Sequence, residues 1–172
     1  MLQPPHIPST QLKHPLLDQL KVALEVLRLD QVHPTVSGNK FFKLKYNLEE
    51  ALKQNHRQVL TFGGAYSNHI YATAAAAKLV GLQSIGIIRG ELLDEKNPTL
   101  RSAKDAGMIL KGLSRELYRD KTQLGYLDQL RQELGEFYLI PEGGTNALAI
   151  QGTTEILSSS QFNFSHLATP IG

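Results

Sequence analysis

Residues 37–71 read SGNKFFKLKYNLEEALKQNHRQVLTFGGAYSNHIY, and this stretch decides the fold. From Phe41 the apolar residues recur at helical spacing, residues 58–62 form a short apolar strand, and Gly63-Gly64 lead into a second helix at Ser67. Lys40 falls in the first turn of the first helix, where unpaired N–H groups disfavour an ammonium group. The same field lowers the pKa of a lysine, and a lysine that forms a Schiff base needs its neutral amine. A functional Lys40 and a lysine that points into water both explain the position, and for the residue alone the surface is the default.

Short apolar strands alternate with helical patterns along the rest of the chain. After an extended arm (residues 1–16), we expect strands over 22–29, 58–62, 84–88, 108–110 and 137–140, and a last one that begins over 166–169. Helices are expected from Phe41 onward and over 67–80, 98–106, 122–134 and 146–157. This alternation predicts an α/β fold with open, parallel, twisted sheets. Ligands of such sheets bind at the carboxyl ends of the strands, where Gly63-Gly64 and Gly143-Gly144 lie.

Composition excludes several classes of protein. The chain has 172 residues, 41% of them hydrophobic and 20% charged, with a net charge of +2 and no cysteine, which excludes a disulfide scaffold and thiolate chemistry. Basic residues between positions 101 and 121 alternate with acidic ones, so we interpret them as a solvated surface and expect no nucleic-acid partner. Neither a signal peptide nor a membrane span is evident, and the expected compartment is the cytoplasm.

Polar residues at the two predicted helix starts are the candidates for chemistry. Ser67 and Asn68 are good capping residues, and a helix start also binds anions, so Ser67-Asn68-His69 either caps the helix or holds a carboxylate. Lys43 lies one turn after Lys40 on the same helix face, and its charge would further lower the pKa of Lys40. Asn39 either caps the first helix or contacts a ligand. The histidines lack the spacing of a metal site.

Three motifs together resemble one known family. SGNKFFKLKYNL, LTFGGAYSNHIYATAAAAKLVG and YLIPEGGTNALAIQG are similar to segments of the aminocyclopropanecarboxylate deaminase / D-cysteine desulfhydrase family, in the family's order and spacing. These are pyridoxal-phosphate enzymes with the two-lobed tryptophan-synthase-β-like fold. The resemblance implies a cofactor-lobe segment over residues 1–45 with Lys40, a small α/β lobe over 46–145, and a return to the cofactor lobe over 146–172. It also implies a small amino-acid substrate, release of ammonia and a keto acid, and a homodimer in the full-length family.

Site roles follow from the same resemblance. Lys40 would bind pyridoxal 5'-phosphate covalently, Lys43 would contact its phosphate, and Asn68 its ring oxygen, with Asn39 beside it. Ser67 would be the nucleophile or proton-handling group. The substrate would lie against Gly64, Ser67, Asn68 and His69. His69 matches the desulfhydrase-like members, whereas the deaminases proper carry glutamine there. Pro141-Glu142-Gly143-Gly144-Thr145-Asn146 would line the cleft.

The family's phosphate-binding loop would begin where this sequence ends, at residues 168–172. The resemblance therefore implies a C-terminally truncated family member in which catalytic activity is expected to be absent. A second hypothesis is a non-catalytic α/β module that binds a small anion at Ser67-Asn68. A nucleotide-binding Rossmann unit is disfavoured because GGAYSN lacks G-x-G-x-x-G.

Overall fold

The fold was analysed in a computed structural model, which describes residues 2, 6–91, 94, 96–121, 124–158 and 164–169. The strands are β1 (Ser9–Leu12), β2 (Leu24–Leu27), β3 (Gln58–Gly64), β4 (Gln83–Arg89), β5 (Ile109–Leu113) and β6 (Tyr138–Ile140). The α-helices are α1 (Pro15–Leu20), α2 (Asn39–Lys53), α3 (Asn68–Leu79), α4 (Pro98–Asp105), α5 (Arg115–Arg119), α6 (Leu124–Leu134) and α7 (Ala147–Ser158). Two 3-10 turns complete the order, η1 (Leu29–Gln31) and η2 (Glu142–Gly144).

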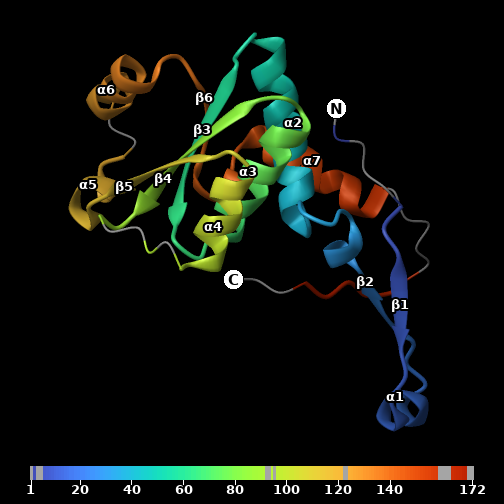
Figure 1. The fold of residues 1–172 in the computed structure, drawn as a ribbon. Coiled ribbons are helices and arrows are strands. Elements are labelled where there is room, and N and C mark those ends of the chain that lie inside the picture. Colours follow the sequence, from blue (N-terminus) through green and yellow to red (C-terminus); the bar gives the residue numbers. More distant parts are fainter. Residues whose placement is uncertain are drawn as a thin grey trace.

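A parallel four-stranded sheet forms the centre of the molecule. Its strand order is β5-β4-β3-β6, and all three pairs of neighbours are parallel. Figure 1 shows α5 and α6 on one side of this sheet and α2, α3, α4 and α7 on the other. The predicted parallel α/β sheet is therefore confirmed, and the carboxyl ends of β3 and β4 lie side by side, because Gly64 is paired with Arg89.

Alternation along the strands explains the two helical layers. Leu60 and Phe62 of β3 pack in one cluster with Leu127 and Leu130 of α6. Val59, the neighbour of Leu60 in sequence, packs instead in the cluster of α2 and α3. Successive side chains of a strand point to opposite faces, so an apolar run such as VLTF supplies both layers at once. The alanines of α3 are buried, and their small side chains allow this helix to pack closely on the sheet.

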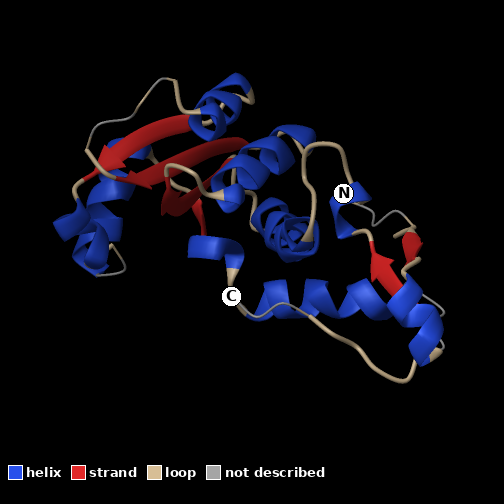
Figure 2. Ribbon diagram, turned by 90° about the horizontal axis from the view of Figure 1, so that it is seen from below, coloured by secondary structure: helices blue, strands red, loops and turns tan. Residues whose placement is uncertain are grey.

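The N-terminal segment differs from the expected extended arm of residues 1–16, because β1 and the start of α1 lie where the arm was expected, whereas β2 confirms the strand expected over 22–29. β1 pairs antiparallel with β2, and α1 lies between them, so this segment is a hairpin. Both views show it at the end of the molecule away from α5 and α6 (Figures 1 and 2). Apolar side chains such as Leu20, Val22 and Leu24 are exposed on it.

Two further expectations need correction. Residues 166–169 contain no strand. α5 was not foreseen, because a helix of five residues is too short for its apolar spacing to repeat. The expected start of the helix over 122–134 lies partly outside the described residues, and α6 begins at Leu124. No helix in the described part of the chain is long and apolar enough to cross a membrane.

Candidate functional site

The start of α3 follows directly from the carboxyl end of β3. Ser67 is the N-cap residue, and its Oγ accepts a hydrogen bond from the backbone N–H of His69 at 3.2 Å. Gly63 allows this turn to close, because a Cβ atom there would lie 2.5 Å from Cγ1 of Ile70 and 3.1 Å from Oγ of Ser67. The capping role predicted for Ser67 is confirmed. Asn68 is the first residue of the helix, and its side chain is exposed.

The start of α2 positions the two candidate lysines. Gly38 is the N-cap residue with a φ of 69°, so the expectation that Asn39 caps the helix is wrong. The side-chain oxygen of Asn39 instead accepts a hydrogen bond from Nζ of Lys40 at 3.4 Å. Lys40 is half-buried. Burial, and then the positive charge of Lys43, hold the pKa of Lys40 below its usual value. A lowered pKa was expected, although burial contributes more than the neighbouring charge.

The turn after β6 lies against α2 and α3. Nζ of Lys43 donates a hydrogen bond to Oγ1 of Thr145 at 3.2 Å. A Cβ atom added to Gly144 would lie 3.2 Å from Cε1 of His69 and 3.6 Å from Cβ of Lys43. The structure thus brings together Lys40, Lys43, His69, Gly144 and Thr145, which we call the lysine site.

His69 is buried within this site and does not project into solvent, with 2% of its surface exposed. Its Nε2 lies 2.8 Å from Oγ1 of Thr61, and that hydroxyl donates to the carbonyl oxygen of Ile140 at 2.9 Å. Because the hydroxyl hydrogen is directed to Ile140, Oγ1 accepts the hydrogen of Nε2, which leaves Nδ1 of His69 as an unprotonated acceptor. This Nδ1 has no hydrogen-bond partner among the described residues.

Burial and the charges of Lys40 and Lys43 lower the pKa of His69 to about 4, against smaller raising effects of Glu142 and the Pro141 carbonyl. The imidazole is therefore neutral at pH 7. Sequence reasoning overlooked Thr61, although a polar residue inside the apolar run VLTF is the signal that could have identified it. Its hydroxyl fixes the orientation of His69 between β3, α3 and β6.

A second group of side chains surrounds a cleft of about 500 Å³. We call it the arginine cleft; its lining residues are Arg89, Arg115, Tyr118, Arg119, Lys121 and Glu142. The sequence pattern suggested basic residues spread over a solvated surface. The structure instead gathers those at 115, 119 and 121 around one cleft. Pairing of β4 with β5 explains the difference, because Arg89 is opposite Leu113, two residues before Arg115.

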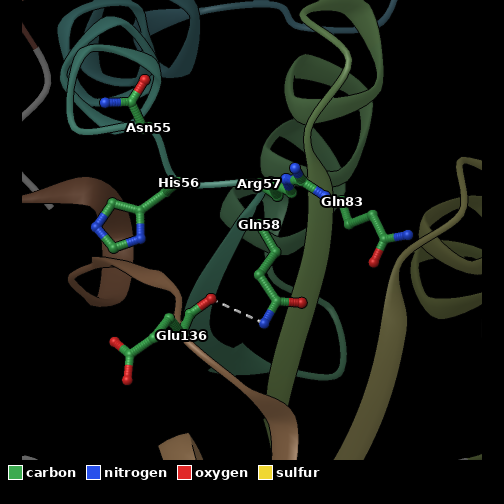
Figure 3. A pocket seen from close by; sticks show the side chains of 6 residues that line it. All are labelled: Asn55, His56, Arg57, Gln58, Gln83 and Glu136. Atoms are coloured by element: carbon green, nitrogen blue, oxygen red, sulfur yellow. Dashed lines mark hydrogen bonds between the residues drawn. The ribbon is translucent and has the colours of Figure 1, made fainter.

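A second hollow, of about 430 Å³, lies at the opposite end of the sheet (Figure 3). Gln58 and Gln83, the first residues of β3 and β4, line it together with Asn55, His56, Arg57 and Glu136. Nε2 of Gln58 donates to the carbonyl oxygen of Glu136 at 3.0 Å, as the dashed line in Figure 3 marks. None of the predicted site residues is found there. Within the described residues, no group of histidine and acidic side chains could hold a metal ion.

The lysine site can perform nucleophilic and proton-transfer chemistry. A lowered pKa increases the share of neutral amine, and the neutral amine is the form that acts as a nucleophile or a base. The start of α3 offers partly positive N–H groups to an anion beside it. His69 and Lys43 both lie against Gly144, which brings the buried imidazole to the same region as the start of α2.

The chain is similar to curated proteins over most of its length, and no model of a protein family matches it. It is 37% identical over 130 residues to a putative 1-aminocyclopropane-1-carboxylate deaminase of Thermotoga maritima, covering 74% of this chain and 41% of that protein. It is 33% identical to a bifunctional D-cysteine desulfhydrase/1-aminocyclopropane-1-carboxylate deaminase of Arabidopsis thaliana, covering 77% of this chain and 35% of that protein. For a D-cysteine desulfhydrase of Serratia proteamaculans the identity is 30%, covering 85% of this chain and 47% of that protein.

Solved structures agree with the sequence comparison. A crystal structure of an ACC deaminase homologue matches with a TM-score of 0.76 and 27% identity, covering 95% of this chain and 51% of the other. A fungal L-serine ammonia-lyase from Rhizomucor miehei, at 14% identity and a TM-score of 0.61, shares the fold. The chain therefore spans about half the length, or less, of the proteins it matches.

Proposed function

Because this chain belongs to the 1-aminocyclopropane-1-carboxylate deaminase / D-cysteine desulfhydrase family, we propose that it contributes Lys40 to a pyridoxal-phosphate-dependent deaminase or lyase that acts on a small amino acid. Enzymes of this family use pyridoxal phosphate. One observation carries the proposal: the Lys40 amine is half-buried beside a second cation, and its pKa is lowered. A lysine in this environment has more neutral amine available at pH 7 than a surface lysine has.

The residues present fit this cofactor by their chemistry. Lys40 would supply the amine that holds the cofactor, and Lys43 and the starts of α2 and α3 would favour its anionic phosphate and ring oxygen. We assign Asn39 and Asn68 as polar contacts of the cofactor, since both are exposed beside these helix starts. When bound, the cofactor acts as an electron sink for charge that develops on the substrate.

Substrate binding is assigned to the turn that leads into α3. We assign Gly64, Ser67, Asn68 and His69 to this role, with the substrate carboxylate near the partly positive helix start. His69 would contribute through its backbone and through Nδ1, because its Nε2 is occupied by Thr61. The family's tryptophan-synthase-β-like division into residues 1–45, 46–145 and 146–172 is part of the same proposal.

Two residues would move protons. The Lys40 amine, once released from the cofactor, would accept the proton from Cα of the substrate. Ser67 would act as the nucleophile or proton donor if the substrate carries a ring that must open. The histidine at position 69 favours D-cysteine-type substrates, as in the desulfhydrase-like relatives, and the products would be ammonia and a keto acid. The homodimer of the full-length family is proposed for the whole protein.

Attachment of the cofactor tests the proposal without a need for turnover. The purified chain is incubated with pyridoxal phosphate, reduced with borohydride, digested and analysed by peptide mass spectrometry. We expect label on Lys40, a visible absorption band before reduction, and loss of both in Lys40→Ala. Lys53→Ala is the matched control, because Lys53 lies on the same helix with 81% of its side chain exposed. Labelling spread equally over the surface lysines, or an unchanged band in Lys40→Ala, would contradict the proposal.

The alternative function is a non-catalytic module that binds a small anion at the start of α3. The start of α3 at Ser67-Asn68 favours it, because Asn68 is exposed and a helix start attracts anions. The same experiment separates the two functions. A chain that binds a small carboxylate at this turn but leaves Lys40 unlabelled would be such a module. We also expect the purified 172-residue chain to release ammonia from D-cysteine far more slowly than a complete enzyme.

A further inference from the structure

The arginine cleft gathers cations that have no counter-charge. Among the described residues, Arg89, Arg115 and Arg119 form no ion pair with any carboxylate. All three side chains are exposed and line the same hollow of about 500 Å³. Guanidinium groups repel one another, and each offers several N–H donors in a rigid planar arrangement. Three of them around one concave surface form an arrangement that an anion would stabilise.

The wall of the cleft is held in place by a tyrosine and an ion pair. Nζ of Lys121 lies 3.1 Å from a carboxylate oxygen of Glu142 and 4.4 Å from the ring centroid of Tyr118. The Arg89 guanidinium lies 6.0 Å from the same ring centroid. Burial alone would raise the pKa of Glu142, but Lys121, Tyr118 and Arg89 hold it below its usual value. Glu142 is thus ionised at neutral pH and forms its ion pair with Lys121, so none of the three arginines has an ion pair of its own within the described residues.

The cleft adjoins the lysine site but is built from other side chains. Glu142 and Gly144 belong to the same turn, η2, which faces the cleft at one end and His69 at the other. Nη2 of Arg89 lies 3.7 Å from the position that a Cβ atom of Gly64 would take. A ligand in the cleft would therefore lie next to the turn that leads into α3, without a need for Lys40 or Lys43.

We propose that the arginine cleft binds the phosphate group of a small molecule, in a site separate from the lysine site. A single carboxylate would neutralise only one of the three free guanidinium groups. A phosphate group carries close to two negative charges at pH 7 and several acceptor oxygens, so it can accept hydrogen bonds from two or three guanidinium groups at once. The shared chemistry is the phosphate, whether it is free or part of an ester other than the cofactor at Lys40.

Calorimetric titration of the purified chain with inorganic phosphate and with pyrophosphate, at constant ionic strength in chloride buffer, tests the proposal. We expect saturable binding at one site. Arg115→Gln and Arg119→Gln should each weaken it by about tenfold or more, because a charge-assisted hydrogen bond is lost. The matched control is Arg101→Gln, since Arg101 is exposed on α4 and forms no ion pair within the described residues. Its affinity should stay within about twofold.

Two further measurements separate the possible sources of the phosphate and guard against misfolding. Lys40→Ala should bind phosphate with the affinity of the wild type, because Lys40 does not line the cleft. This result would hold even if the proposed role of Lys40 in an enzyme were wrong. Phosphate should raise the melting temperature of the wild type but not that of Arg115→Gln, whose melting temperature without phosphate should equal that of the wild type. Absence of saturable binding, equal weakening in Arg101→Gln, or competition between phosphate and pyridoxal phosphate for labelling of Lys40 would overturn the proposal.

Discussion

Nε2 of His69 lies 2.8 Å from Oγ1 of Thr61, so a buried imidazole of α3 is hydrogen-bonded to the middle of the central strand β3. The carbonyl oxygen of Ile140 accepts a hydrogen bond from the Thr61 hydroxyl, which extends the chain of hydrogen bonds to β6. This arrangement holds the imidazole in its neutral form between three elements. Lys40 and Lys43 of α2 and Glu142 of η2 are the charged groups that act on it.

The pKa of His69 predicts an acid-sensitive fold. The pKa is about 4 in the folded chain and about 6.5 in an unfolded one. Below pH 6.5 the imidazole is protonated in the unfolded chain but stays neutral in the folded chain. The stabilisation present above pH 6.5 is therefore lost as the pH falls through 4. The loss amounts to about 3 kcal/mol. Urea unfolding between pH 7.5 and 4.5 should show this dependence, and His69→Gln should lack most of it. An equal pH dependence in both proteins would contradict the assignment.

Lys43→Gln should raise the pKa of Lys40. The positive charge of Lys43 lowers this pKa in addition to the larger effect of burial, so its removal restores part of the shift. The pH midpoint for modification of Lys40 by an amine-reactive reagent, followed by peptide mass spectrometry, should therefore move upward. Lys53→Gln, on the same helix, should leave the midpoint unchanged. A midpoint that stays constant or moves downward in Lys43→Gln would show that Lys43 does not influence the amine.

Local patterns were sufficient to predict the central sheet and the start of α3. Short runs over 58–62 and 84–88, between helical patterns, marked β3 and β4, and Ser67 is the cap that its residue type predicted. The strand predicted over 22–29 is β2, but β1 and the hairpin that the two strands form could not be predicted in this way. β1 is exposed along its whole length, so it does not carry the alternation of a half-buried strand. Pairing between them depends on a partner that the local pattern does not identify.

The arginine cleft and the Thr61–His69 contact depend on tertiary structure. Arg89 and Arg115 are far apart in sequence, and the parallel pairing of β4 with β5 brings their ends together. The sequence showed His69 at a helix start but not which way its side chain points. Because α3 packs its first turn against β3, the imidazole is directed inward. Spacing shows which residues share one face of a helix, but the tertiary structure decides which face lies against the sheet.

Substitution of Gly144 should be more harmful than substitution of its neighbour Gly143. Both residues have a positive φ, 68° and 69°, so alanine is strained at either position, at a cost of about 1–2 kcal/mol. A methyl group at Gly144 would also lie 3.2 Å from Cε1 of His69, which Thr61 holds in place, whereas at Gly143 the nearest atom is Oγ1 of Thr145 at 3.7 Å. Urea unfolding of both variants measures the difference, and equal losses would mean that His69 can move aside.

The contact between α2 and α7 provides the last prediction, which concerns Gly152. A Cβ atom added to this buried glycine of α7 would overlap the carbonyl oxygen of Phe42 in α2. The two helices are further joined by Lys45, whose Nζ lies 2.8 Å from a carboxylate oxygen of Glu155. A backbone carbonyl inside a helix cannot turn away, so Gly152→Ala must push the helices apart.

Gly152→Ala should therefore lower the free energy of unfolding by about 3 kcal/mol, at the upper end of the cost of overpacking. The matched control is Gly125→Ala on the exposed face of α6, where an added Cβ atom meets nothing within 4 Å. That variant should gain about 0.5–1 kcal/mol, because alanine is the better helix former. Thermal and urea unfolding of the two variants measure both effects. If Gly152→Ala were as stable as Gly125→Ala, α7 would not pack on α2 in solution as it does in this structure.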